Sequence, residues 1–68
     1  MAQRNYNRLK IVLAEKNKTN KWLANRINKN QATVSQWCTN KSQPKIETLF
    51  EIAHELDVDV RELLISSK

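Results

Sequence analysis

The chain has 68 residues, a formal net charge of +5 and a sequence isoelectric point of about 9.7. A chain this short buries only about 60% of the surface that its unfolded form exposes, so we expect residues 1–68 to form one small helical domain. Hydrophobic residues make up 40% of the chain and charged residues 28%, which is typical of a folded domain rather than a disordered segment. No apolar run approaches the ~18 residues of a membrane span. The amino end also lacks the apolar stretch of a secretion signal.

The single cysteine, Cys38, excludes an intrachain disulfide and a cysteine-based zinc site. We therefore expect a cytoplasmic protein without a metal or other cofactor. Its charge is unevenly divided, because residues 1–45 hold ten Lys or Arg against one acid, a net +9, whereas residues 46–68 hold two against six, a net −4. This division predicts a basic end that meets a polyanion and an acidic end kept away from it. Chance clustering on a solvated surface is the alternative.

The first predicted helix covers residues 5–16, where apolar residues recur at helical spacing. These residues are Tyr6, Leu9, Val12 and Leu13. Ile11 falls outside the stripe and is expected to be exposed.

Two further helices are predicted at 20–27 and 31–38, with Thr19 and Asn30 as their N-caps. One apolar stripe continues from the first of them to the second, so the pair forms a helix-turn-helix around a shared core. The stripe consists of Leu23, Ile27, Val34 and Trp37.

The outward face of the helix at 31–38 follows from the rotation of about 100° per residue. With Val34 pointing inward, Trp37 and Cys38 lie near it, and Ala32 and Gln36 point outward. The exposed face is therefore short, neutral and rich in amide and hydroxyl groups. It consists of Gln31, Ala32, Thr33, Ser35 and Gln36, bordered by Lys29 and Lys41.

A turn at 39–44 leads through Pro44 to a fourth helix at 46–56. The fourth helix carries an apolar stripe of Ile46, Leu49, Ile52, Ala53 and Leu56, with Phe50 at its edge. Asp59 and Glu62 form a capping-box pattern. They start a short fifth helix that is expected to bury Val60, Leu63 and Leu64.

The chain contains no glycine, although a residue just past a helix end usually adopts the left-handed conformation, where glycine is cheapest. Asn and Asp tolerate that conformation better than other residues do. The residues at which the helical patterns stop are Asn17, Asn28, Asn40 and Asp57. We expect these four residues to replace glycine.

Over residues 7–64 the pattern resembles the Cro and phage-repressor type of helix-turn-helix domain, the XRE family. The matching strings are TNKWLANRIN, NQATVSQW, TNKSQP, ETLFEIAHELDV and VRELL. The resemblance implies an all-α, lambda-repressor-like five-helix bundle that binds operator DNA, usually as a dimer. The chain departs from the family at Asn28, which replaces a turn glycine, at Lys18 and Lys29, which replace apolar residues, and at Lys45, which replaces a serine cap.

The resemblance assigns base reading to the exposed face of the third helix. Gln can form two hydrogen bonds with adenine, the hydroxyls of Ser and Thr can hydrogen-bond to several bases, and Ala can contact the thymine methyl group. It also implies that Asn20 binds phosphate at the start of the second helix. The remaining phosphate candidates are Arg8, Lys29, Asn40, Lys41 and Lys45. Idle surface charge is the alternative for each basic residue.

Four other residues are interpreted as structural. Trp37 is expected in the core, Cys38 as a small core residue and His54 at the surface. Trp22 is expected to pack half-exposed, and contact with DNA or a partner is its alternative.

We therefore expect a sequence-specific regulator of transcription, of the repressor type, that binds double-stranded DNA. It would act as a homodimer on a near-palindromic operator, with Val58, Leu64 and Ile65 as candidate dimer contacts. The sequence shows neither a nucleophile paired with a base nor a glycine-rich phosphate loop, so we do not expect an enzyme. An antitoxin or adaptor that uses the same fold to hold a protein partner is the alternative function.

Overall fold

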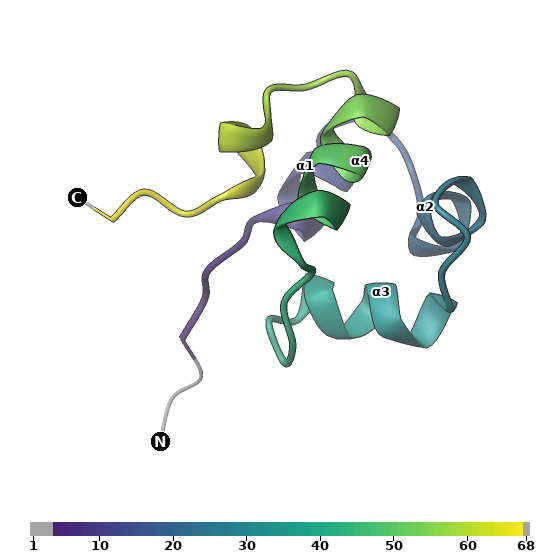
Figure 1. The fold of residues 1–68 in the computed structure, drawn as a ribbon, viewed down its shortest axis with the longest axis horizontal. Helices are drawn as coiled ribbons and strands as arrows, with labels where there is room; N and C mark the ends of the chain where they lie inside the picture. The colour runs from purple at the N-terminus through teal and green to yellow at the C-terminus, as the bar shows by residue number, and fades with distance from the viewer. Residues whose placement is uncertain (1–3, 68) are drawn as a thin grey trace.

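The computed structural model describes residues 4–67, which fold into four α-helices and one short 3₁₀-helix (Figure 1). The elements are α1 (Leu9–Glu15), α2 (Asn20–Arg26), α3 (Gln31–Cys38), α4 (Ile46–Leu56) and the 3₁₀-helix η1 (Val60–Leu63). Within residues 4–67 the β-type pairing is confined to one antiparallel bridge between Asn7 and Leu64. The fold is all-α, as the sequence predicted. None of the helices described has the length and apolarity needed to cross a membrane.

The first helix begins later than predicted, at Leu9 instead of residue 5. The backbone N–H groups of Tyr6 and Asn7 donate to the side chain of Asn40 at 2.9 and 3.1 Å, so a distant residue holds this segment outside the helix. The side chain of Asn7 then accepts the Leu9 N–H at 3.0 Å and ends the extended segment. Tyr6, predicted on the buried stripe, is 56% exposed as a result.

The predicted fifth α-helix is also a correction, because η1 is a single 3₁₀ turn of four residues. Its start was predicted accurately, since Asp59 and Glu62 form the capping box. Leu64, predicted to be buried, has extended backbone and is 40% exposed. The reason is that the chain leaves the turn to pair with the amino-terminal segment, where the Ile65 N–H donates to the Tyr6 carbonyl at 2.9 Å.

The four predicted left-handed positions are confirmed. Asn17, Asn28, Asn40 and Asp57 have φ values of 57°, 56°, 61° and 57°. Each residue follows the end of a helix, and the next N–H along the chain turns back onto that helix, as in the bond of 2.8 Å from the Lys29 N–H to the Ala24 carbonyl. In this chain without glycine, Asn and Asp therefore provide the left-handed residue after each of the four α-helices.

The core lies between the helices, and α2 packs on both α3 and α4. It contains the predicted stripe of the helix-turn-helix together with residues from α1, α4 and η1. Its most deeply buried large side chains are Leu9, Val12, Leu23, Val34, Ile52 and Leu63. Trp37 and Cys38 are buried as predicted. Ile46 is a further correction, because it begins α4 at the surface and is 61% exposed.

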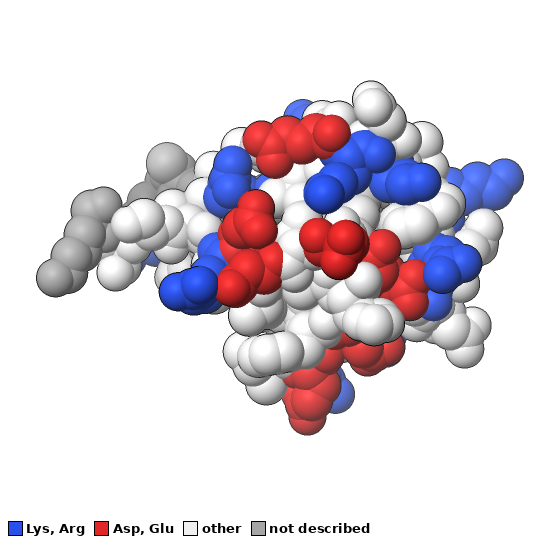
Figure 2. Space-filling model, turned by 90° about the horizontal axis from the view of Figure 1, so that it is seen from above, with Lys and Arg blue, Asp and Glu red and all other residues white. Residues whose placement is uncertain are grey.

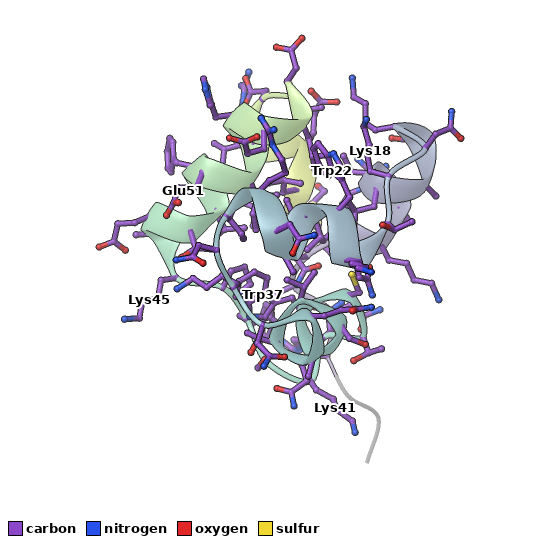
Figure 3. All side chains as sticks on the ribbon, turned by 90° about the vertical axis from the view of Figure 1, so that its right-hand side faces the viewer. Lys18, Trp22, Trp37, Lys41, Lys45 and Glu51 are labelled. Carbon is purple, nitrogen blue, oxygen red and sulfur yellow. The ribbon has the colours of Figure 1, made fainter. Side chains whose placement is uncertain are left out.

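Trp22 packs half-buried against the core, and two cationic groups lie over its ring. The Lys18 Nζ is 4.7 Å and the Arg26 guanidinium carbon 5.8 Å from the ring centroid. The Arg26 Nε also donates to Glu55 at 2.7 Å and so ties α2 to α4. In Figure 3, Lys18 and Trp22 lie together and well away from Lys41, which extends beyond α3. Trp22 therefore stabilises the outer side of α2, as the packing interpretation predicted.

Candidate nucleic-acid interface

The outward face of α3 carries the polar side chains that the sequence assigned to it. Four of them are exposed and Thr33 is partly exposed, whereas Val34, Trp37 and Cys38 face the core. The exposed residues are Gln31, Ala32, Ser35 and Gln36. Along this face α3 offers amide and hydroxyl donors and acceptors with no formal charge, which is the chemistry that reads base edges.

The amino end of α3 is fixed by a cap and a left-handed turn. The Asn30 side chain accepts the Ala32 N–H at 2.7 Å. The preceding turn places Asn28 in the left-handed region and exposes Lys29. Lys29 departs from the apolar residue usual in the family, and its exposure explains how the turn accepts a charged side chain without burying it.

The carboxyl end of α3 is fixed by the turn that follows. The Thr39 hydroxyl donates to the carbonyls of Ser35 and Gln36 at 3.3 and 3.2 Å, and the Lys41 N–H donates to the Gln36 carbonyl at 2.9 Å. The Ser42 hydroxyl lies 3.5 Å from the Gln36 Oε1. These contacts satisfy carbonyls that a helix end leaves unpaired and hold Gln36 beside the turn.

A buried polar cluster lies under this turn. The Asn40 Oδ1 accepts hydrogen bonds from the Tyr6 and Asn7 N–H groups and from the Gln43 Nε2, and its Nδ2 donates to the Asn7 carbonyl. The Asn7 Nδ2 donates to the Trp37 carbonyl at 3.0 Å and to the Gln43 Oε1 at 2.7 Å. Because the side-chain oxygen and nitrogen of Asn40 both form hydrogen bonds inside the protein, this residue holds the turn in place. The predicted phosphate contact of Asn40, donated from this turn, stays a prediction.

The predicted basic residues do not all lie together. Lys29, Lys41 and Lys45 are exposed. In Figure 3, Lys41 extends beyond α3 and Lys45 extends beside α4. The Arg8 guanidinium instead donates to the Glu62 carbonyl at 3.1 Å, and its backbone N–H donates to the Leu63 carbonyl. Arg8 thus joins the amino-terminal segment to η1, and its phosphate role stays a prediction.

Asn20 is partly buried at the start of α2, where its Oδ1 accepts the Cys38 thiol at 3.3 Å. This contact occupies the Asn20 Oδ1, so the amide Nδ2 is the donor of that side chain that remains for a ligand. Burial raises the pKa of the Cys38 thiol, and the charge of nearby Lys10 opposes that rise. Lys10 is exposed on α1, so it adds a cation near the start of α2. The sequence did not distinguish Lys10 from other surface lysines.

The acidic residues gather on another side of the molecule. Figure 2 views the structure from above Figure 1, opposite α3, and shows Asp and Glu side chains near the middle of that face with Lys and Arg between and around them. Six of the seven acids belong to residues 46–68. Among these acids, hydrogen bonds from Arg61 lower the pKa of Asp59. The side opposite α3 therefore carries acidic side chains, whereas the exposed face of α3 carries no formal charge.

The candidate dimer residues lie in the carboxyl-terminal part. Leu64 and Ile65 are 40% and 43% exposed, whereas Val58 is half-buried against the core. Tyr6, from the paired amino-terminal segment, is exposed beside Ile65, and its carbonyl accepts the Ile65 N–H. The sequence missed Tyr6 as a neighbour of this patch because helical spacing placed it on α1.

Comparisons with known proteins agree with this arrangement. A family model described as helix-turn-helix matches residues 9–63. A solved structure from Bacteroides fragilis, described as a "putative DNA-binding protein", is 51% identical to the chain and superimposes with a TM-score of 0.86. That match covers 87% of this chain and 95% of the other. No curated protein matches the chain.

Proposed function

The chain belongs to the XRE-type helix-turn-helix family, and from this premise we propose that it is a sequence-specific transcriptional repressor that inserts α3 into the major groove of double-stranded DNA. The observation that carries the proposal is the exposed face of α3, which is uncharged, is held at both ends and is bordered by Lys29 and Lys41. The protein binds rather than catalyses, and it would act in the cytoplasm, where its DNA target lies.

In this proposal the exposed face of α3 reads bases. Gln31, at the amino end, approaches the base edges first, as the recognition helix of such domains does. Gln31 and Gln36 each present an amide that can bond twice to adenine. Thr33 and Ser35 add hydroxyl groups that can hydrogen-bond to several bases, and the Ala32 methyl group can contact the thymine methyl group.

Phosphate contacts would surround that face. Lys29 precedes α3, Lys41 follows it and Lys45 precedes α4, and all three are exposed. The Asn20 amide Nδ2 would donate to a phosphate at the start of α2, since its Oδ1 is used by Cys38. Such contacts set the register of the protein on the duplex without reading its sequence.

We propose that two copies bind together, because a single domain with a few base contacts discriminates weakly between sites. Val58, Leu64 and Ile65 would form the contact, since Leu64 and Ile65 are exposed apolar side chains and the acidic elements α4 and η1, between which Val58 lies, would not face DNA. Two recognition helices about 34 Å apart would then read half-sites roughly 10 base pairs apart in a near-palindromic operator.

An antitoxin or adaptor function is favoured by a different observation. Ile46 and Phe50 lie four residues apart on α4 and are 61% and 57% exposed, and residues at that spacing share one face of a helix. This pair would suit an apolar protein surface. DNA binding and partner binding by separate faces are compatible.

Selection of preferred duplexes from a random pool, followed by binding titrations over a range of salt, separates the two functions. About six phosphate contacts give a slope of roughly −5 for log K against log salt concentration. A steep slope with a selected consensus supports the DNA-binding proposal. A flat slope, or a pool that yields no consensus, contradicts it and leaves the partner-binding function.

A further inference from the structure

We propose that residues 4–8 form a short arm whose Arg4 binds a DNA phosphate outside the groove that α3 enters. This inference rests on the proposed DNA-binding function and adds a contact to it. The sequence had assigned the basic role in this region to Arg8. The structure holds the Arg8 guanidinium at the Glu62 carbonyl beside η1, so Arg4 is the cation of the segment that is not held by a hydrogen bond to η1.

The direction of the arm is set by the polar cluster beneath the turn after α3. Asn40 holds the N–H groups of Tyr6 and Asn7, and the Asn7 side chain binds the Trp37 carbonyl at the end of α3. The segment is therefore fastened to α3 itself. In Figure 1 it runs from α1 down to the level of α3, past the turn that follows that helix. Arg4 lies two residues beyond the last fastened position, so its backbone is within about 7 Å of it.

The four arginines of the chain differ in their partners. Arg26 pairs with Glu55, Arg61 pairs with Asp59, and Arg8 donates to the Glu62 carbonyl. Among residues 4–67 no carboxylate pairs with Arg4. A guanidinium left without an acid partner keeps its full charge and its fork of donors for a phosphate.

The surroundings of Arg4 suit an anion. A cleft of about 260 Å³ separates the arm from the end of the chain, and it is lined by Arg4, Asn5, Tyr6, Ile65, Ser66 and Ser67. The polar groups of these residues are one guanidinium, one amide and three hydroxyls, with no carboxylate among them. A phosphate entering the cleft therefore meets donors and no like charge.

The test compares two variants that each remove one positive charge. Arg4→Ala removes the proposed contact, and Lys18→Ala removes a cation that lies over Trp22, away from α3. Binding is measured as a function of salt on the selected duplex and on a random one. For Arg4→Ala we expect the slope to shrink by about 1, with the same fold-loss of affinity on both duplexes. Lys18→Ala should leave the slope unchanged.

Ethylation interference locates the contact directly. In the wild-type complex, ethylation of one phosphate outside the bases read by α3 should weaken binding, and Arg4→Ala should abolish that sensitivity alone. The inference is overturned if Arg4→Ala leaves the slope and the interference pattern unchanged, if Lys18→Ala lowers the slope equally, or if the loss is confined to the selected duplex. In each case salt-dependent binding by the wild-type protein still supports the proposed function. If the wild-type protein does not bind DNA, both proposals fail together.

Discussion

Asn7 and Asn40 hydrogen-bond to each other in both directions across 33 residues of chain. The Asn7 N–H donates to the Asn40 Oδ1 and the Asn40 Nδ2 donates to the Asn7 carbonyl, both at 3.1 Å. The two residues are 4% and 8% exposed, so these bonds are shielded from solvent in the folded protein. This pair joins the amino-terminal segment to the turn that ends the recognition helix.

Asn40→Gly keeps a residue suited to the left-handed backbone and deletes the side chain. It should lower the free energy of unfolding by about 2 kcal/mol, because the buried N–H of Asn7 and the part-buried N–H of Tyr6 lose their acceptor. Asn17→Gly is the matched control, since Asn17 has a similar φ and an exposed side chain. Urea denaturation of both variants measures the difference. Equal stability of the two would show that the buried bonds contribute nothing.

Asn28→Gly should stabilise the protein by a few tenths to about 1 kcal/mol, because Asn28 is exposed and pays for a left-handed backbone that glycine adopts without strain. Thermal unfolding followed by circular dichroism measures the effect. A lower melting temperature would mean that the Asn28 side chain stabilises the turn.

Gln31→Ala and Gln36→Ala should each cost about 1–3 kcal/mol of binding on the preferred duplex and little on random DNA. Lys41→Ala is the contrasting variant, because loss of a phosphate contact weakens binding to both duplexes alike. Titrations at one fixed salt concentration compare the three. If the glutamine variants lose affinity equally on both duplexes, those residues contact the backbone instead of bases.

The cap at Asp59 gives a pH dependence. Hydrogen bonds from Arg61 lower the pKa of this carboxyl in the folded protein. Its stabilising effect is therefore complete above the unfolded pKa of about 3.9 and is lost as the pH falls through the lower folded value. Asp59→Asn should be less stable than wild type at pH 7, and the difference should disappear in strong acid.

Thermal melts between pH 7 and pH 2 test this expectation, with Glu51→Gln as a control that neutralises an exposed acid on α4. A constant difference between Asp59→Asn and wild type over that range would contradict the linkage. So would an equal change in the Glu51→Gln variant.

The proposed dimer predicts a dependence on helical phase. Inserting five base pairs between the half-sites turns one of them by about half a turn of the duplex, so two copies docked through Val58, Leu64 and Ile65 can no longer read both. The affinity of the pair for the duplex with the insertion should fall, although each half-site can still bind one copy. Analytical ultracentrifugation on both duplexes measures stoichiometry and affinity. Unchanged affinity with two copies per duplex would show that the domains bind independently.

Local signals in the sequence predicted most of the helical framework. Thr19, Asn30 and Asp59 cap their helices as expected, because capping depends on residues within one turn. The outward face of α3 followed from the rotation per residue alone. The left-handed positions were recognisable because each Asn or Asp stands where a helical pattern stops.

Long-range polar contacts carried no such signal. Tyr6 has helical spacing to Leu9, yet Asn40 takes its N–H, and nothing periodic connects two residues so far apart. The same reason explains why Leu64 was assigned to the core. Leu64 and Arg8 belong to the contact between the amino-terminal and carboxyl-terminal segments, which exists only in the folded structure.

That contact has a consequence for the order of folding. The Arg8 N–H bonds to the Leu63 carbonyl, so the chain closes nearly its whole length into a loop. Closing so long a loop costs entropy that only the packed helices can offset, whereas α2 and α3 meet across a turn of a few residues. We expect the two ends to join last and to open first. A small opening there would detach the arm from the recognition helix while the helix-turn-helix stays folded, and hydrogen exchange at the Arg8 and Ile65 amides would report it.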